Sequence, residues 1–199
     1  MALAERLRIS PGVPLLLAAF VWLASPLLLG AILSAAVCHE LGHWLVLRRG
    51  GGRIQRLHIT VFGAEMQVDD RRISYGGELL AAAAGPASNL LLAAALGLLG
   101  RWWEPLYLFA GAQLVLGAFN LLPALPLDGG RILWLALAWL TEPYTAQRVL
   151  SAVSLAVSLA LLLGGGGLIW RLGGSPFLLV GAVGLTGWNL REIKLAKGG

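Results

Sequence analysis

Two histidines and a glutamate stand close together in the stretch His39-Glu40-Leu41-Gly42-His43. On a helix, residues four apart share a face, so the two imidazoles can converge on one cation. Glu40 lies beside the first imidazole, near enough to take a proton from a water molecule at that cation. With three histidines in the chain, this pattern has a chance likelihood of roughly one in several hundred. It predicts zinc ligands at His39 and His43 and a general base at Glu40. The alternative is a polar helix face bonded to neighbouring helices.

The motif lies inside a long apolar run, and the composition shows that such runs dominate the chain. Hydrophobic residues make up 58% of the sequence and charged residues only 13%, with a mean hydropathy of +0.78. Soluble domains carry about 25% charged residues. A disulfide scaffold is excluded by the single cysteine. These values predict an integral membrane protein, in which ionisable groups cost about 2.5–3.5 kcal/mol each and so usually mark function.

We predict an all-α polytopic membrane protein, with residues 1–199 forming a single domain of six transmembrane helices. One uncharged stretch, interrupted by Ser25-Pro26, is divided there into two spans. A further apolar piece, Ile132–Leu140, would reach only about 13 Å as a helix, too short to cross a bilayer. The six spans are predicted at residues 9–25, 26–47, 79–99, 105–127, 149–170 and 172–190.

The positions of the basic residues predict the orientation of these spans. With the N-terminus in the cytoplasm, only Arg101 and Arg171 of the 15 Lys and Arg residues lie on the outer side. Cytoplasmic loops are enriched in Lys and Arg. We therefore expect a multi-pass protein of the bacterial cell membrane with both termini in the cytoplasm. The basic blocks flank apolar runs, so they indicate contact with a lipid bilayer and not with nucleic acid.

A small cytoplasmic β-hairpin is predicted at residues 53–69, between the second and third spans. A turn at Phe62-Gly63 would place Ile59 opposite Met66 on one face and Arg56 opposite Asp69 on the other. A register that pairs apolar residues on one face and opposite charges on the other favours a hairpin. An irregular loop is the alternative.

Asp128 is the candidate for the third zinc ligand that a site with two imidazoles requires. It follows Pro123 and Pro126, which cannot continue regular helical hydrogen bonding, so the chain should unwind there. His43 lies shortly before Arg48 and Asp128 shortly before Arg131, which places both near the cytoplasmic surface. A helix-capping or salt-bridge role is the alternative for Asp128.

Three motifs in the chain together resemble those of the site-2 protease family of intramembrane zinc metalloproteases. They are His39-Glu40-Leu41-Gly42-His43, Ala84-Gly85-Pro86-Ala87-Ser88-Asn89, and Asn120 with Pro126-Leu127-Asp128-Gly129-Gly130-Arg131. The resemblance extends from Pro11 to about Leu190. It is strongest to the stage IV sporulation branch, which processes a pro-sigma factor, but without that branch's C-terminal cystathionine-β-synthase-type (CBS) domain.

The resemblance implies the same zinc ligands and the same general base that residue type and spacing predict. The ligands are His39, His43 and Asp128, and the base is Glu40. The resemblance adds Asn120, which matches an asparagine that orients the substrate or the oxyanion. Asn89, in the third span, is a further candidate for substrate or oxyanion binding, although a packing role fits it equally well.

The implied activity is zinc-dependent hydrolysis of a peptide bond in a membrane-tethered regulatory protein, near its cytoplasmic end. Transmembrane or membrane-associated substrates and membrane inhibitor proteins are the expected partners. A polytopic divalent-metal transporter, an inactive membrane scaffold and a zinc protease with its motif in a cytoplasmic domain are the alternatives. Repeated halves are typical of transporters, and none is evident in the sequence.

Overall fold

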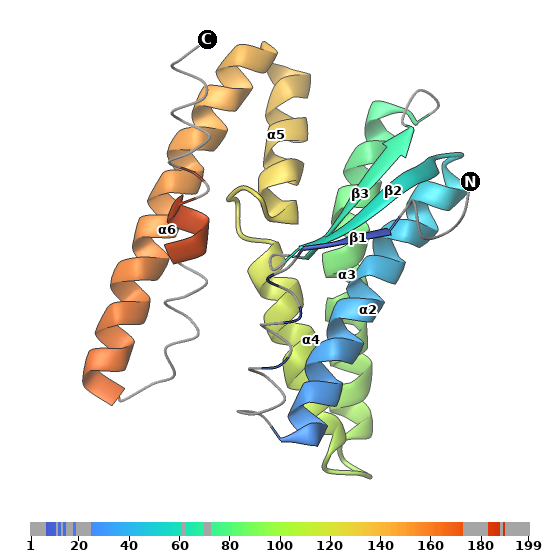
Figure 1. Cartoon of the computed structure of the whole chain (residues 1–199), viewed down its shortest axis with the longest axis vertical. Helices are drawn as coiled ribbons and strands as arrows, with labels where there is room; N and C mark the ends of the chain where they lie inside the picture. Colours follow the sequence, from blue (N-terminus) through green and yellow to red (C-terminus); the bar gives the residue numbers. More distant parts are fainter. Residues whose placement is uncertain are drawn as a thin grey trace. The chain divides into compact units, whose positions relative to one another are not determined.

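The computed structural model describes residues 7–10, 12, 14, 18, 25–60, 63–69, 73–172, 183–187 and 189. These residues are mostly helical (Figure 1). The chain divides into two compact units, Met1–Phe119 and Asn120–Gly199. Its elements, in order, are β1 Leu7–Ile9, α2 Pro26–Arg49, β2 Arg53–Thr60, β3 Gly63–Asp69, α3 Tyr75–Leu99, α4 Leu106–Asn120, α5 Asp128–Leu140 and α6 Pro143–Leu172.

Helix α2 begins and ends at residues suited to helix termini. The Ser25 hydroxyl accepts a hydrogen bond from the Leu28 amide (3.2 Å), and Pro26 occupies the first turn, where its missing N–H costs nothing. Arg48 and Arg49 lie in the last turn, where cations interact favourably with the helix dipole. The break predicted at Ser25-Pro26 is therefore the start of α2.

Helices α2 and α3 pack side by side and approach closely at small residues (Figure 1). A Cβ added at Gly42 of α2 would lie 2.6 Å from the Ala84 carbonyl oxygen of α3. The hydroxyl of Ser88 on α3 donates to the Cys38 carbonyl (3.1 Å) as well as to the Gly85 carbonyl (2.7 Å). The glycine at position 42 therefore allows a close contact in the same part of α2 that carries the histidines.

Helix α4 approaches α3 at a second glycine. A Cβ at Gly117 would lie 2.9 Å from the Asn89 Cβ and 3.2 Å from the Pro86 carbonyl oxygen. Gln113, one turn earlier on α4, is buried at 2% exposure. The close approach brings this polar side chain within reach of α3.

The strands form a sheet of order β1-β2-β3, in which β2 and β3 are antiparallel and β1 is parallel to β2. The predicted register was wrong. Ile59 pairs with Ala64, not with Met66, and Asp69 pairs with Arg53, not with Arg56. Thr60 pairs with Gly63, which moves the turn toward the N-terminus by one residue, and an irregularity between residues 54 and 56 shifts the register again.

In the second unit, α5 packs against α6. Helix α6 buries Ser154 and Ser158, both at 0% exposure, one turn apart. Asn189 is buried beside them, and its amide donates to the Ser158 hydroxyl (3.0 Å) and to the Leu185 carbonyl (2.9 Å). Polar side chains in an apolar helix are thus satisfied by one another, as burial requires.

Among the described residues, three helices are long and apolar enough to cross a membrane: Pro26–Arg49, Tyr75–Leu99 and the Pro143–Gly167 part of α6. Several predicted span boundaries differ from the structure, and α3 and α6 begin at Tyr75 and Pro143, earlier than the predicted 79 and 149. Ile9, the expected start of the first span, is the last residue of β1. Helix α4 ends at Asn120 and not near Leu127, because the segment with Pro123 and Pro126 is irregular. Most of the first and sixth predicted spans lies outside the described residues.

Candidate metal centre

The imidazoles of His39 and His43 face each other on one side of α2. Their Nε2 atoms are 3.1 Å apart, and the ring planes meet at 83° with centroids 4.7 Å apart. His39 is buried at 6% exposure and His43 is half-buried. The spacing of four residues therefore brings the two rings together as expected.

The second nitrogen of each ring has its own partner. His39 Nδ1 lies 2.6 Å from Asn89 Oδ1, and His43 Nδ1 lies 2.7 Å from the Ala81 carbonyl oxygen. A carbonyl oxygen only accepts hydrogen bonds, so each neutral imidazole donates from Nδ1. Neither Nε2 then carries a proton, and the two nitrogens present lone pairs toward each other.

Two facing lone pairs suit a shared cation. Nitrogens bound to one tetrahedral Zn²⁺ at usual bond lengths lie about 3.3 Å apart, close to the 3.1 Å found here. Histidines that bind metals usually donate their other N–H to a carbonyl or carboxylate oxygen, as both rings do. The donor chemistry of His39 and His43 therefore fits zinc.

A glycine provides the space for the second ring. A Cβ added at Gly85 would overlap the His43 ring, with 2.6 Å to its Cε1 and 2.8 Å to its Cδ2. Gly85 is buried on α3, in the same turn as Pro86. The Gly-Pro pair thus lets the His43 ring lie directly against the α3 backbone.

Asn89 lies behind His39 and has no exposed surface. Its Nδ2 donates to the Ala35 carbonyl (3.0 Å) and to Gln113 Oε1 (2.5 Å). Of the two roles expected for Asn89, its burial favours a hydrogen bond that holds the site over direct contact with substrate.

Asp128, in the second unit, is the first residue of α5. A carboxylate is favourable in the first turn of a helix because of the helix dipole. The two glycines that follow it allow the preceding segment to fold back over this turn. A Cβ at Gly129 would overlap the Leu121 carbonyl, and one at Gly130 would lie 2.7 Å from the Ala124 carbonyl.

The backbone before Asp128 is held by hydrogen bonds from side chains of the same unit. The Leu125 amide donates to the Ser154 hydroxyl (3.0 Å), and its carbonyl accepts from Asn189 Nδ2 (3.3 Å). Both backbone groups of one residue are thereby satisfied within an irregular, half-buried segment.

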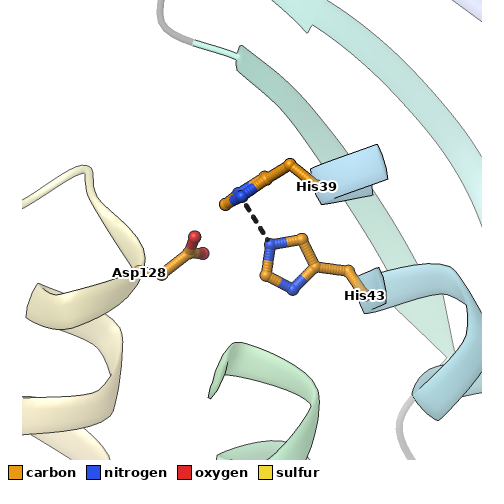
Figure 2. Close-up of side chains that lie close together, drawn as sticks. All are labelled: His39, His43 and Asp128. Carbon is orange, nitrogen blue, oxygen red and sulfur yellow. Dashed lines mark hydrogen bonds between the residues drawn. The ribbon is translucent and has the colours of Figure 1, made fainter. Parts of the chain in front are cut away.

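Figure 2 draws the three predicted ligands, His39, His43 and Asp128, and marks the close contact between the two imidazoles. Two imidazoles and a carboxylate are a common ligand set of catalytic zinc sites. The three residues match that set in the type of donor atom that each offers.

The other two predicted site residues lie on α2 and α4. Glu40 is half-buried on α2, between the two histidines in sequence, and one of its carboxylate oxygens is buried. Asn120 is the half-buried last residue of α4. Gln113, Ser154 and Asn189 were not predicted, although amides and hydroxyls within apolar runs are a signal for such partners.

Comparison with known proteins agrees with this arrangement. Residues 98–164 match the model of peptidase family M50. Putative zinc metalloprotease Rip3 of Mycobacterium tuberculosis is 32% identical over 165 residues, 70% of this chain. Zinc metalloprotease MJ0392 of Methanocaldococcus jannaschii is 30% identical over 138 residues, 66% of this chain. The chain spans 40% of the length of each of these relatives.

The fold is that of a solved structure, a site-2 protease from Methanocaldococcus jannaschii. The TM-score is 0.71 at 24% sequence identity, over 94% of this chain and 89% of that one. The chain is thus similar to zinc metalloproteases and to peptidase family M50 in sequence, and it shares the fold of a site-2 protease. The sporulation branch expected from the sequence is a finer assignment than these comparisons make.

Proposed function

We propose that this chain is an intramembrane zinc endopeptidase that cleaves membrane-tethered proteins near their cytoplasmic ends. The observation that carries the proposal is the pair of imidazole Nε2 atoms 3.1 Å apart on a helix long enough to cross a membrane. The match to peptidase family M50 supports it.

His39, His43 and Asp128 would hold the metal, and Glu40 would move the protons of the reaction. Bound zinc supplies a Lewis acid that polarises a peptide carbonyl and makes water nucleophilic at neutral pH. Glu40 accepts the proton of the attacking water and delivers it to the leaving amine nitrogen. Asn120 is proposed to orient the substrate carbonyl.

The substrate must be unwound where it is cleaved, because the carbonyl groups of a transmembrane helix are hydrogen-bonded within the helix. Helix-weakening residues near the cytoplasmic end should therefore favour cleavage. An unwound segment can pair with a sheet edge, and β3 has a strand partner on one side only among the described residues. Substrate pairing at β3 predicts that Ile59→Pro, which disturbs the neighbouring strand β2, slows cleavage.

We further propose six spans with both termini in the cytoplasm of a bacterial cell membrane. The substrate would be a regulatory protein such as a pro-sigma factor, and membrane inhibitor proteins would control the reaction. The support for these assignments is the resemblance of the motifs to the sporulation branch and the distribution of basic residues.

The test is Glu40→Gln, measured on a single-span reporter with Gly and Pro in the cytoplasmic third of its helix. Removing a general base should lower cleavage about 10²–10⁴-fold, whereas zinc remains bound at the wild-type stoichiometry. Glu104→Gln, at an exposed glutamate, is the matched control and should cleave normally. Wild-type cleavage by Glu40→Gln would overturn the catalytic role.

Metal transport is the competing function. An assay on the same purified protein distinguishes transport from proteolysis. A transporter exchanges its ion across the membrane, whereas a peptidase retains it. Zinc-loaded protein in sealed vesicles should therefore cleave the reporter without moving zinc into the vesicle lumen. Glu40-independent zinc uptake would favour the transporter.

A further inference from the structure

Gln113 and Asn89 are two buried amides that connect three helices behind the metal centre. Gln113 is on α4 and 2% exposed, and Asn89 is on α3 and 0% exposed. They meet through a hydrogen bond from Asn89 Nδ2 to Gln113 Oε1, and Asn89 meets His39 of α2 through its Oδ1. Both side chains lie in apolar helices, where polar groups require partners.

Two acceptors together set the orientation of the Asn89 amide. Its nitrogen lies 3.0 Å from the Ala35 carbonyl oxygen, which can only accept. Nδ2 has a second hydrogen, which it donates to Gln113 Oε1. With both acceptors in place, Nδ2 points to Ala35 and Gln113 while Oδ1 points to His39.

This orientation determines which nitrogen of His39 bears the proton. Asn89 Oδ1 accepts only, so Nδ1 of His39 is the donor and Nε2 is left with its lone pair. A flipped Asn89 amide would instead favour a proton on Nε2, the atom that faces His43. The state of His39 that binds metal thus depends on the orientation of the Asn89 amide on the neighbouring helix α3.

We propose that Gln113 and Asn89 form an amide relay that holds His39 in the tautomer competent to bind metal. Both are positioning residues, since Asn89 acts through His39 and Gln113 acts through Asn89. This inference rests on the proposed role of His39 in the metal centre. Its first test uses neither metal nor substrate, so the relay and the proposed function can fail separately.

The first test is the ¹⁵N NMR spectrum of zinc-free protein with labelled histidine, recorded where the imidazoles are neutral. With three histidines in the chain, the ring signals can be assigned by substitution. The relay predicts that His39 is protonated at Nδ1 in the wild type, and that Gln113→Met introduces the Nε2-protonated form. An Nε2-protonated His39 in the wild type would overturn the proposal.

The second test is zinc affinity, measured by competition with a chelator. Loss of an outer partner of a ligating histidine commonly lowers metal affinity about 10–100-fold. We expect this loss for Asn89→Leu, and about tenfold, at the lower end of that range, for Gln113→Met. Gln147→Met, the same change at a half-buried glutamine of α6, should bind as the wild type does.

A third variant separates the relay from a packing effect. Gln113→Glu, when protonated, retains a carbonyl that can accept from Asn89, so it should keep the wild-type tautomer of His39. Unchanged tautomer and unchanged zinc affinity in Gln113→Met would overturn the relay. If Gln113→Met does not fold, the relay is tested by the spectra of the wild type and of Gln113→Glu. Loss of the Nδ1-protonated form of His39 in Gln113→Glu would contradict the proposal.

Discussion

The two units hold their candidate metal ligands in different ways. In the first, His39 and His43 project from a regular helix, and contacts of their side chains with α3 set the ring orientations. In the second, Asp128 follows an irregular segment whose backbone is held by Ser154 and Asn189. Ligand orientation thus depends on side chains in one unit and on the chain path in the other.

The difference has a physical cause in what each ligand needs. An imidazole has two nitrogens, so a partner at Nδ1 determines the state of Nε2. A carboxylate has equivalent oxygens, and its position depends mainly on the backbone that carries it. Substitutions near the histidines should therefore alter metal affinity with little change in fold, whereas those before Asp128 should alter both.

The largest effect is expected for Gly129→Ala. A Cβ there would overlap the backbone of residues 121 and 122, which cannot move without reshaping the segment before Asp128. Overpacking of this kind costs about 3 kcal/mol, on the order of 100-fold in zinc affinity. Zinc competition and thermal unfolding should both show the loss. Gly111→Ala, where a Cβ meets nothing within 4 Å, is the control.

Gly85→Ala should have the next largest effect, and on metal binding alone. The new methyl group would displace the His43 ring, which can rotate away without moving the backbone. We expect a loss of about 1–2 kcal/mol in zinc binding, or roughly 10-fold, with a near-normal melting temperature. Gly97→Ala, on the same helix in open space, should change neither. If Gly85→Ala lowered the melting temperature as much as Gly129→Ala, the two units would not differ in how they hold their ligands.

Ser154→Ala tests the support of the irregular segment. The Leu125 amide would lose its partner, at a cost of about 1–2 kcal/mol in the free energy of unfolding. Zinc affinity should fall a few-fold with it, because the segment leads into Asp128. Ser151→Ala, at a half-buried serine of the same helix, is the comparison. Lower stability with unchanged zinc affinity would show that the segment does not position Asp128.

The smallest effect is expected for Ser88→Ala. Its hydroxyl contacts carbonyl groups of α2 and α3 but neither histidine. Chemical denaturation should show a loss of about 0.5–1 kcal/mol, with zinc affinity unchanged. A tenfold loss of zinc affinity would mean that helix packing, and not the side-chain contacts of the histidines, orients the rings.

The sequence predicted the parts of the site that depend on local spacing. Residues four apart on a helix share a face, so His39 and His43 could be paired from their numbers alone. Pro123 and Pro126 predicted the irregular segment, because proline cannot donate to a helical hydrogen bond. The helix boundary at Asn120 was still misplaced, since the apolar run continues beyond the point where hydrogen bonding ends.

Several features that depend on contacts between distant segments were not predicted. The partners of Asn89 come from positions 35, 39 and 113, and nothing in the local sequence links them. Ile9, the last residue of β1, was placed in the first span because an uncharged apolar run begins there. The sheet register was misplaced because Thr60 pairs with Gly63 and because the pairing shifts between Ile54 and Arg56.

We propose that His39, His43 and Asp128 bind one zinc ion. X-ray absorption at the zinc edge of the purified chain reports the ligands of that ion. We expect one zinc per chain with two imidazole nitrogens at about 2.0–2.1 Å and oxygen ligands at similar distance. The imidazole signal should weaken in His39→Ala and the oxygen shell should change in Asp128→Ala. A chain that binds no zinc, or zinc with a sulfur ligand at about 2.3 Å, would contradict the account.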